Sequence, residues 1–294
     1  MANLCNLCPR HCGVDRSVSL GFCLVGEDPV IARAAPHYGE EPCISGTRGS
    51  GTVFFSGCNL RCVFCQNHEI SRGQEGKPVT VGRLREIFLE LQDLGVHNIN
   101  LVTPTHYTLA IAEALDRAQL EIPVAWNSSG YDTVESLRLL RGKVQIYMPD
   151  FKYSDHRMAK AYSAAPDYPE VARAAIAEMY RQVGPYRLDS EGILQQGLLV
   201  RHLIMPGKPA NTRGVIDCLT EMLPQGSFLF SLMSQYTPMP GLEAYPELQQ
   251  TVTPALSEFC YRYMEKKGIT DGYFQDLDAA TDEMIPDFDL TGVE

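Results

Sequence analysis

The sequence lacks any long apolar run: no stretch approaches the roughly 18 to 20 consecutive apolar residues that a membrane-spanning helix needs. Its opening stretch, MANLCNLCPRHCG, also lacks the apolar segment of an export signal. Positive charge is scarce, with 25 Lys and Arg against 36 Asp and Glu and a formal net charge of -11. Because phosphate binding depends on clustered basic side chains, we expect no nucleic-acid partner. We likewise expect no membrane contact and a cytoplasmic location.

Cysteine is scarce only in the later part of the chain. Of the ten cysteines, eight lie in the first 65 residues, and only Cys218 and Cys260 lie beyond them. We expect these two to be small apolar residues of helices. Thiols stay reduced in the cytoplasm, so the clustered thiols predict metal or redox sites rather than disulfides.

Six short apolar runs alternate with amphipathic segments from Thr52 onward. The runs cover residues 52–56, 98–102, 122–127, 144–148, 198–204 and 227–233. Between the first two, one helix face is marked by the spacing of Leu84, Ile87, Phe88 and Leu91. This alternation is typical of parallel βαβ units, and six strands are too few to close an eight-stranded barrel. The pattern predicts an α/β fold, a partial (β/α)6 barrel of the TIM type.

We divide the chain into three parts. Residues 1–48 form a Cys-rich, metal-binding module, and residues 49–270 form the partial barrel, which ends with a long helix at about 245–267. Residues 271–294 form an extension with many acidic residues and no Lys or Arg. Its interspersed apolar side chains predict that part of the extension packs on the barrel.

The loop after the first apolar run, CNLRCVFCQN, places Cys58, Cys62 and Cys65 at gaps of three and two residues. Functional side chains of parallel sheets collect at the C-terminal ends of the strands. Thiolates select iron–sulfur clusters, zinc or copper(I), and three of them leave one iron of a four-iron cluster without a protein ligand. An open metal position is what a catalytic site keeps. The alternatives are a zinc site completed by His68 and three unrelated buried thiols.

The spacing CxxxCxΦC, in which Φ is the aromatic Phe64, resembles the signature of radical S-adenosylmethionine (SAM) enzymes. With the stretches NINLVTPTH, NSSGY, DFKY and RHLIMPG, the chain looks like the PflX-type proteins, relatives of pyruvate formate-lyase activating enzyme. The resemblance implies a catalytic [4Fe-4S] cluster on Cys58, Cys62 and Cys65, with SAM on its open iron. It also implies reductive cleavage of SAM to a 5′-deoxyadenosyl radical, which abstracts hydrogen from the substrate.

The resemblance implies SAM contacts in the first two loops of the barrel. Phe64 stands where an aromatic ring packs against the adenine, although it could equally be a core residue. TPTH replaces the usual Gly-Gly-Glu-like motif, so Thr103, Thr105 and His106 become its substitutes. The alternative is that Thr103 caps a helix that has Pro104 in its first turn.

Further SAM contacts are implied in the later loops. The MPDFK stretch matches a Met-x-Asp-x-Lys arrangement, in which Asp150 and Lys152 belong to the SAM site and Lys152 pairs with the carboxylate. Asn127, Ser128, Met148 and Asp150 would line a monovalent cation site. His202 stands where related enzymes contact the SAM ribose, and the alternative is an ordinary hydrogen-bonded histidine.

Four further thiols precede the barrel: Cys5, Cys8, Cys12 and Cys23 form C-x2-C-x3-C-x10-C. Four thiolates make a closed site, which suits zinc or a second iron–sulfur cluster. Either metal group could hold this segment in its fold, and only an iron–sulfur cluster could relay electrons. Cys43 could replace one of the four ligands and stays unassigned.

Two classes of function compete. The chain could be an oxygen-sensitive radical SAM enzyme that receives electrons from a flavodoxin or ferredoxin. The resemblance favours an activase that places a radical on a glycyl radical enzyme, and direct action on a small molecule or peptide is the alternative. A non-enzymatic iron–sulfur electron carrier is the alternative from another class.

Overall fold

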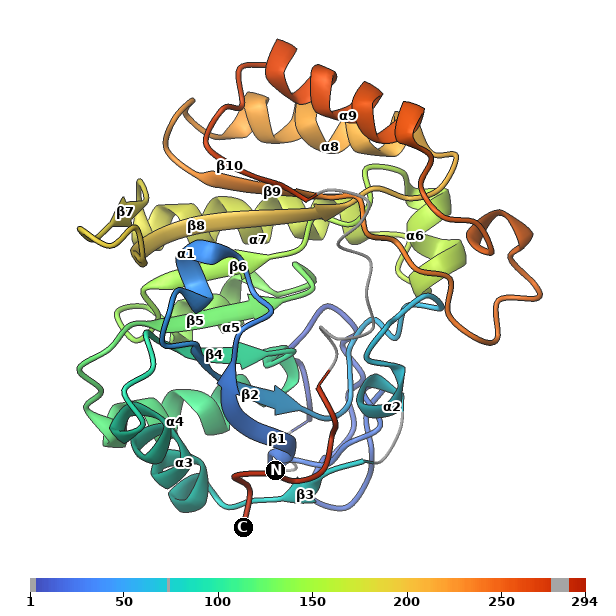
Figure 1. The fold of residues 1–294 in the computed structure, drawn as a ribbon. Helices are drawn as coiled ribbons and strands as arrows, with labels where there is room; N and C mark the ends of the chain where they lie inside the picture. Colours follow the sequence, from blue (N-terminus) through green and yellow to red (C-terminus); the bar gives the residue numbers. More distant parts are fainter. Residues whose placement is uncertain (1–3, 73–74, 276–285) are drawn as a thin grey trace.

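The fold centres on one curved, mostly parallel sheet (Figure 1). The computed structural model describes residues 4–72, 75–275 and 286–294. The strand order within them is β10-β9-β8-β6-β5-β4-β2-β1-β3, and the short β7 (Arg187–Leu188) pairs with β8. The parallel strands are β2 (Ser50–Phe55), β4 (Ile99–Val102), β5 (Val124–Ser128), β6 (Ile146–Pro149), β8 (Leu194–Leu203), β9 (Leu229–Met233) and β10 (Gly272–Gln275). The predicted α/β partial barrel is therefore confirmed, with β10 as a parallel strand that the sequence pattern missed.

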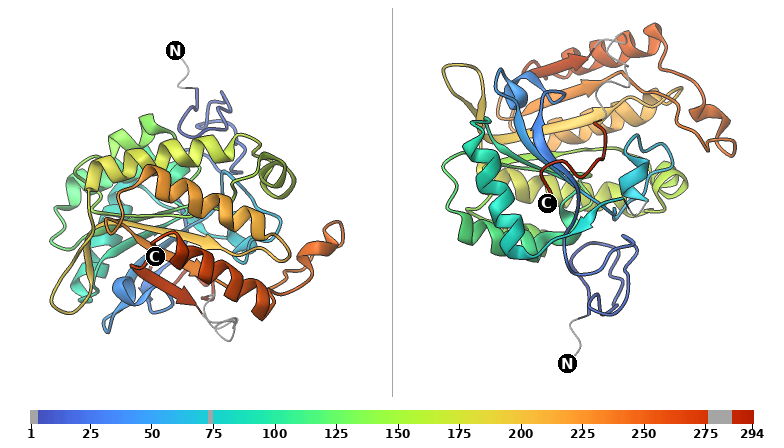
Figure 2. Two further views of the ribbon diagram at one scale, coloured as in Figure 1. Left: turned by 90° about the horizontal axis from the view of Figure 1, so that it is seen from above. Right: turned by 60° about the horizontal axis from the view of Figure 1, so that its bottom comes forward.

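Helices cover the outer face of the sheet (Figures 1 and 2). They are α3 (Val81–Asp93), α4 (Thr108–Ala118), α5 (Val134–Leu139), α6 (His156–Ser163), α7 (Tyr168–Val183), α8 (Pro209–Met222) and α9 (Pro254–Lys266). In α3 the four buried residues are those whose spacing marked the helix, Leu84, Ile87, Phe88 and Leu91. Thr80 caps this helix by accepting a hydrogen bond from the Arg83 amide. No helix of the described residues is long and apolar enough to cross a membrane.

The interior of the barrel has a small apolar floor of its own. The short helix α1 (Pro42–Ser45) inserts Cys43 and Ile44 among the inward side chains of the strands. Those side chains are Ala125, Ile146, Met148, Leu194, Leu199 and Leu229. Cys43 is therefore a core residue of the barrel and stands apart from the N-terminal thiols. The closed floor leaves the opposite end, at the C-terminal ends of the strands, for a ligand.

Strand β1 (Val30–His37) extends the sheet on the side of β2. It pairs antiparallel with β2 and, at Val30 and Ile31, with β3 (Lys77–Pro78). Residues 30–37 thus belong to the sheet, within the segment that the sequence pattern assigned to the N-terminal module. Residues 4–29 lie outside the sheet as a set of loops (Figure 2).

The end of the chain packs on β1. The Leu290 amide donates to the Ala32 carbonyl at 3.0 Å, and the Ala34 amide donates to the Thr291 carbonyl at 2.8 Å. Val293 is buried beside them. Residues 276–285, which belong to the predicted acidic extension, lie outside the described residues.

Two helix boundaries differ from the sequence expectation. The last long helix begins at Pro254, because Thr253 caps it and the preceding Pro246–Leu248 forms only a 3-10 turn, η2. Thr103 does not cap a helix: the 3-10 turn η1 spans Thr105–Tyr107 and α4 follows directly. Thr103 instead adopts φ 59°, a left-handed conformation that is costly for a β-branched residue.

Two histidines that the resemblance assigned to the SAM site are buried parts of the frame. His106 Nε2 bonds the Ser56 carbonyl at 2.9 Å, and burial lowers the pKa of His106 to about 3. His202 Nδ1 bonds the Phe151 carbonyl at 2.6 Å, and its Nε2 lies 3.0 Å from the Thr212 hydroxyl. Burial lowers the pKa of His202 to about 4. A carbonyl can only accept, so the bonded nitrogen of each ring carries the proton and both rings are neutral.

These histidines should make the chain less stable as the pH falls below about 6.5. Below that pH the histidines of the unfolded chain bind protons, whereas those of the folded chain stay neutral. Each histidine therefore lowers the free energy of unfolding by up to about 1.4 kcal/mol per pH unit. His106→Gln and His202→Asn preserve the donated hydrogen bond and should each reduce the pH slope of the unfolding free energy. Urea unfolding between about pH 5 and 7 measures it. An unchanged slope in both variants would contradict the buried, neutral state.

A glycine pair tests how closely the loops of the barrel approach each other. Gly130 has φ 73°, and a Cβ there would lie 2.2 Å from the Asp150 carbonyl oxygen. Gly142 has φ 79° with nothing within 4 Å of its Cβ position. Gly142→Ala should cost only the backbone strain of about 1–2 kcal/mol. Gly130→Ala should cost at least about 3 kcal/mol in urea unfolding, because the clash adds to that strain; equal losses would contradict the close approach.

Candidate active site

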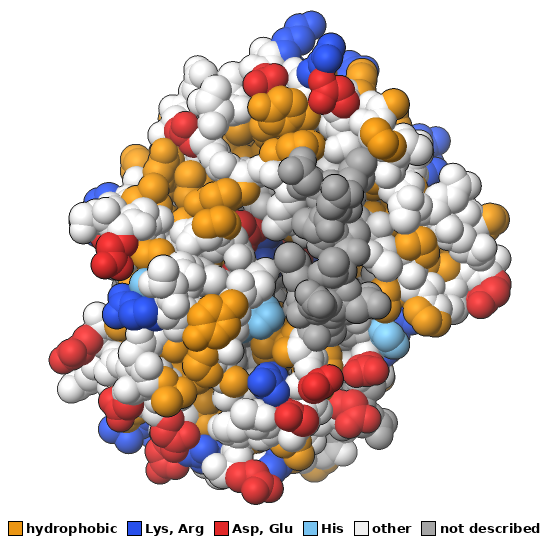
Figure 3. Space-filling model, viewed as in Figure 1, with side chains coloured by type: hydrophobic (Ala, Val, Ile, Leu, Met, Phe, Trp, Pro, Cys, Tyr) orange, Lys and Arg blue, Asp and Glu red, His pale blue; other side chains and the backbone are white. Residues whose placement is uncertain are grey.

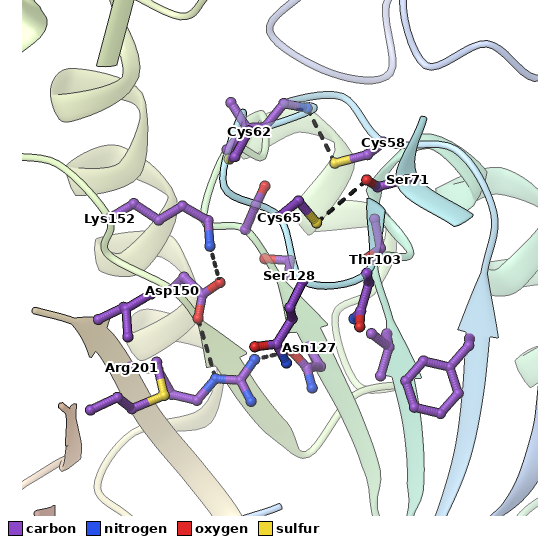
Figure 4. A pocket seen from close by; sticks show the side chains of 18 of the residues that line it. Cys58, Cys62, Cys65, Ser71, Thr103, Asn127, Ser128, Asp150, Lys152 and Arg201 are labelled. Atoms are coloured by element: carbon purple, nitrogen blue, oxygen red, sulfur yellow. Dashed lines mark hydrogen bonds and ion pairs between the residues drawn. The ribbon is translucent and has the colours of Figure 1, made fainter. Parts of the chain in front are cut away.

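A cavity of about 260 Å³ opens at the C-terminal ends of the parallel strands. Each loop after a strand of the barrel contributes to its wall. The lining includes Cys58, Cys62, Phe64, Cys65, Thr103, Asn127, Ser128, Asp150, Lys152 and Arg201 (Figure 4). The predicted rim thus brings together three thiols and several charged side chains from distant parts of the chain.

Each of the three thiols of the cavity receives a hydrogen bond. Cys58 Sγ accepts from the Leu60 amide at 3.3 Å, Cys62 Sγ from the Ser163 hydroxyl at 2.9 Å and Cys65 Sγ from the Ser71 hydroxyl at 3.4 Å. Burial, with a further contribution from Cys62, raises the pKa of Cys58 to about 12. A free thiol here is therefore protonated, and only a bound metal would hold it as a thiolate. The three thiols fit a metal group better than three independent roles.

The spacing of the thiols fits a polynuclear group. Across the described part of the chain, no three His, Cys, Asp or Glu side chains converge closely enough for a single metal ion. His68 is absent from the cavity wall, so the zinc site that it would complete has no support. An iron–sulfur cluster takes each thiolate on a separate iron, which needs wider spacing. No other cysteine lines the cavity among the described residues, so a four-iron cluster on Cys58, Cys62 and Cys65 would keep an open iron.

A chain of alternating charges forms the opposite wall (Figure 4). Lys152 Nζ lies 2.5 Å from Asp150 Oδ2, and Arg201 Nε lies 3.3 Å from Asp150 Oδ1. Arg201 continues to Glu40 Oε2 at 3.0 Å. Burial alone would raise the pKa of Asp150, but Lys152 and Arg201 together lower it below its ordinary value. Burial alone would lower the pKa of Lys152, but the charge of Asp150 raises it. Cys62 and Cys65 lie near enough to raise it further.

The predicted cation site contains a side chain of the protein. The Arg201 guanidinium lies between Asp150 and Asn127, and it donates to the Asn127 side-chain oxygen (Figure 4). Arg201, a residue of β8, thus supplies a positive charge where the resemblance placed a monovalent cation. Ser128 turns away from this position and donates to Asp132 Oδ2 at 2.6 Å.

Phe64 and Thr103 both line the cavity. The Phe64 ring packs against the rings of Tyr153 and Tyr236, with centroids 6.5 Å and 6.1 Å away, so it is both a core residue and a wall of the cavity. The Thr103 amide donates to the Asn127 carbonyl at 2.9 Å, which links the loops after β4 and β5.

Thr105, His106 and His202 stand outside the cavity wall. Thr105 donates to Asp132 Oδ1 at 2.7 Å. Asp132 is buried, and its pKa is raised by burial although three side chains donate to it. These residues support the loops that carry the cavity rather than the ligand itself, which corrects the roles expected for all three.

Sequence reasoning missed Arg201 and Glu40. Arg201 stands inside an apolar run, next to the more conspicuous His202, and successive residues of a strand point to opposite faces. A charged residue in an otherwise buried parallel strand was the signal that could have identified it. Glu40 precedes α1 in a segment without regular pattern, and nothing in the sequence places it near β8.

On the face seen in Figure 3, Lys and Arg side chains are interspersed with Asp and Glu. This face therefore shows no continuous basic patch of the kind that binds nucleic acid.

Comparison with known proteins agrees with this geometry. The Radical SAM superfamily model matches residues 52–184. An uncharacterized protein of Methanocaldococcus jannaschii, MJ0674, is 29% identical over 259 residues, which cover 85% of this chain and 70% of that protein.

Two solved structures match parts of the chain. Streptococcus suis SuiB, bound to its precursor peptide SuiA, has a TM-score of 0.53 and 14% identity over 78% of this chain and 49% of SuiB. The chain thus spans about half the length of SuiB. A domain of pyruvate-formate lyase-activating enzyme from Bacteroides vulgatus has a TM-score of 0.37 and 12% identity over 67% of this chain and 91% of that domain. The thiol loop and strands β2, β4, β5 and β6 fall within residues 52–184, the part of the chain that the Radical SAM superfamily model matches.

Proposed function

We propose that the chain is a radical SAM enzyme with an activase-like role, which acts on a polypeptide partner. The observation that carries the proposal is the pairing of two features in one cavity. Cys58, Cys62 and Cys65 line it beside Lys152, Asp150 and Arg201. When bound, a [4Fe-4S] cluster and SAM would supply one-electron cleavage of SAM to a 5′-deoxyadenosyl radical. The residues of the chain hold, orient and shield these groups.

The charged wall suits the amino-acid part of SAM. Its carboxylate needs a cation, which Lys152 offers from the side of Cys62 and Cys65. Its ammonium needs a carboxylate, which Asp150 offers while Arg201 keeps it ionised. Phe64 offers an aromatic face for the adenine at the same cavity. This wall would fix the orientation of SAM with few movable parts.

The size of the cavity favours a large substrate that enters from outside. About 260 Å³ is near the lower limit of ordinary small-molecule sites, so SAM leaves little room for a second ligand. A polypeptide segment that reaches in from a partner needs no pocket of its own. We therefore favour a glycyl radical enzyme as partner and a flavodoxin or ferredoxin as electron donor. Direct action on a peptide is the second candidate, and it likewise requires a polypeptide segment to enter the cavity.

The first test is SAM cleavage by the anaerobically reconstituted protein with dithionite. We expect 5′-deoxyadenosine by chromatography, and Cys62→Ala should abolish it because the cluster loses a ligand. Cys218→Ala, which removes a thiol from α8, is the matched control. If spectroscopy detects the cluster but no 5′-deoxyadenosine forms, the chain is an electron carrier and the proposal is wrong.

The second test concerns the charged wall. Lys152→Ala should weaken SAM binding about 10- to 100-fold, since a charge-assisted hydrogen bond is worth about 1.5–3 kcal/mol. Asp150 keeps its bond to Arg201 in this variant, so the fold should survive. Lys160→Ala, at an exposed position of α6, is the matched control. Equilibrium dialysis with equal iron contents measures the effect, and equal affinities would remove Lys152 from the site.

A further inference from the structure

The four N-terminal thiols stand outside the cavity, in the loops formed by residues 4–29. Backbone bonds shape these loops: the Cys5 amide donates to the Val14 carbonyl at 2.9 Å, and the Gly13 amide donates to the Cys5 carbonyl at 3.0 Å. The structure brings thiols that are distant in sequence to the same place. A Cβ on Gly21 would lie 3.4 Å from Cys23 Sγ and 3.6 Å from Cys12 Sγ, so the two sulfurs flank a residue without a side chain.

The remaining thiols belong to the same group. Burial raises the pKa of Cys8 to about 12, and Cys23, Cys12 and Cys5 are all near enough to contribute to the rise. The Phe22 amide donates to Cys12 Sγ at 3.3 Å, as the Leu60 amide does to Cys58 Sγ in the cavity. Backbone N–H bonds of this kind stabilise metal-bound thiolates.

A buried cation beside the thiols lacks a counter-charge. Arg16 is 7% exposed, and its guanidinium donates to the carbonyls of His106 and Gly26. Within the described residues no carboxylate lies at ion-pair distance from it, and its Nε has no hydrogen-bond partner. A buried charge needs a partner, and four metal-bound thiolates carry net negative charge. Arg16 therefore indicates an anionic group at the thiols.

Iron fits this group better than zinc. Zinc would gather the four sulfurs about 2.3 Å from one point. No such convergence of three or more donors occurs in the chain from residue 4 onward, apart from the undescribed residues 73–74 and 276–285. The three thiols of the cavity, which are among the described residues, do not converge on one point either. A cluster with one thiolate on each iron accounts for both sets.

The N-terminal loops lie directly against the thiol loop of the cavity. A Cβ on Gly57 would be 2.6 Å from the Cys23 carbonyl oxygen, so the two backbones touch one residue before Cys58. Arg10 Nε donates to the Asn59 carbonyl at 2.7 Å. The Phe22 ring lies between two guanidinium groups, 3.9 Å from that of Arg10 and 3.8 Å from that of Arg61.

Each thiol set has partly exposed and buried members. Cys5 and Cys12 are partly exposed in the N-terminal set and Cys65 in the cavity set, whereas Cys8, Cys23, Cys58 and Cys62 are buried. A protein that delivers electrons thus finds two partly exposed thiols in the N-terminal set.

We propose that Cys5, Cys8, Cys12 and Cys23 bind a second iron–sulfur cluster, which relays single electrons from a donor protein to the cluster of the cavity. The donor loses one electron, the second cluster gains it and passes it on, and no covalent bond changes. The relay rests on the proposed function, whereas the binding of the second cluster does not.

Metal content tests the cluster. In a Cys58→Ala, Cys62→Ala, Cys65→Ala variant reconstituted without oxygen, about four irons per chain should remain, against about eight in the unmodified chain. Cys218→Ala should keep the full content. Zinc at about one per chain with no iron in the triple variant would overturn the proposal. Iron that persists while the unmodified chain cleaves no SAM would refute the proposed function and leave the second cluster standing.

Arg16 provides a test that does not depend on removing ligands. In the triple variant, Arg16→Met removes the neighbouring positive charge, so the midpoint potential of the second cluster should become more negative. Electron paramagnetic resonance during a redox titration measures it. Arg85→Met, in α3, is the control and should leave the potential unchanged. An unchanged potential in Arg16→Met contradicts a cluster at this place.

The relay is tested by comparing two reductants. In Cys8→Ser, Cys12→Ser, the rate of 5′-deoxyadenosine formation with reduced flavodoxin should fall at least tenfold relative to the rate with dithionite. Circular dichroism verifies that the variant is folded. A ratio equal to that of the unmodified chain means that electrons enter directly at the cavity, which would overturn the relay.

Discussion

The geometry of the candidate active site depends on the need of buried charges for partners. Lys152, Asp150, Arg201 and Glu40 alternate in sign from β6 across β8 to the segment before α1. Removal of Asp150 would leave Lys152 without its ion-pair partner, and removal of Arg201 would leave Glu40 without one, each at a cost of about 3–5 kcal/mol. The pairing therefore fixes the strand ends relative to one another, and with them the loops that carry the thiols. Gln235 Oε1, in the cavity wall, has no hydrogen-bond partner among the described residues.

Much of the fold could be predicted because burial imposes a period on the sequence. The six apolar runs are six of the parallel strands, and the apolar face of α3 contains the four residues that its spacing marked. Strands β1 and β10 were not predicted, for two different reasons. β1 mixes Arg33 and Pro36 into a short run, and β10 is four residues long at the edge of the sheet. Neither carries a periodic signal that is distinguishable from a loop.

The site was predictable where chemistry alone selects a residue and less so where direction matters. Three thiols at fixed gaps, and Asp150 with Lys152 after a strand, were predicted to share one rim of the sheet, and all five line the cavity. His202 and Arg201 did not, because a shift of one residue along a strand reverses the side to which a side chain points. Thr105 and His106 were assigned to the ligand by position, whereas their hydrogen-bonding capacity serves Asp132 and Ser56 inside the protein. Such roles depend on partners distant in the chain, which one sequence does not reveal.

The left-handed Thr103 has a consequence for the evolution of this rim. Glycine, and to a lesser degree asparagine, would occupy that backbone conformation at lower energy than threonine. If selection acted on stability alone, related chains should thus replace this threonine with glycine or asparagine. Its persistence among them would mean that selection acts on the hydroxyl or on the stiffness of this turn, and a family alignment could record that preference without any assay.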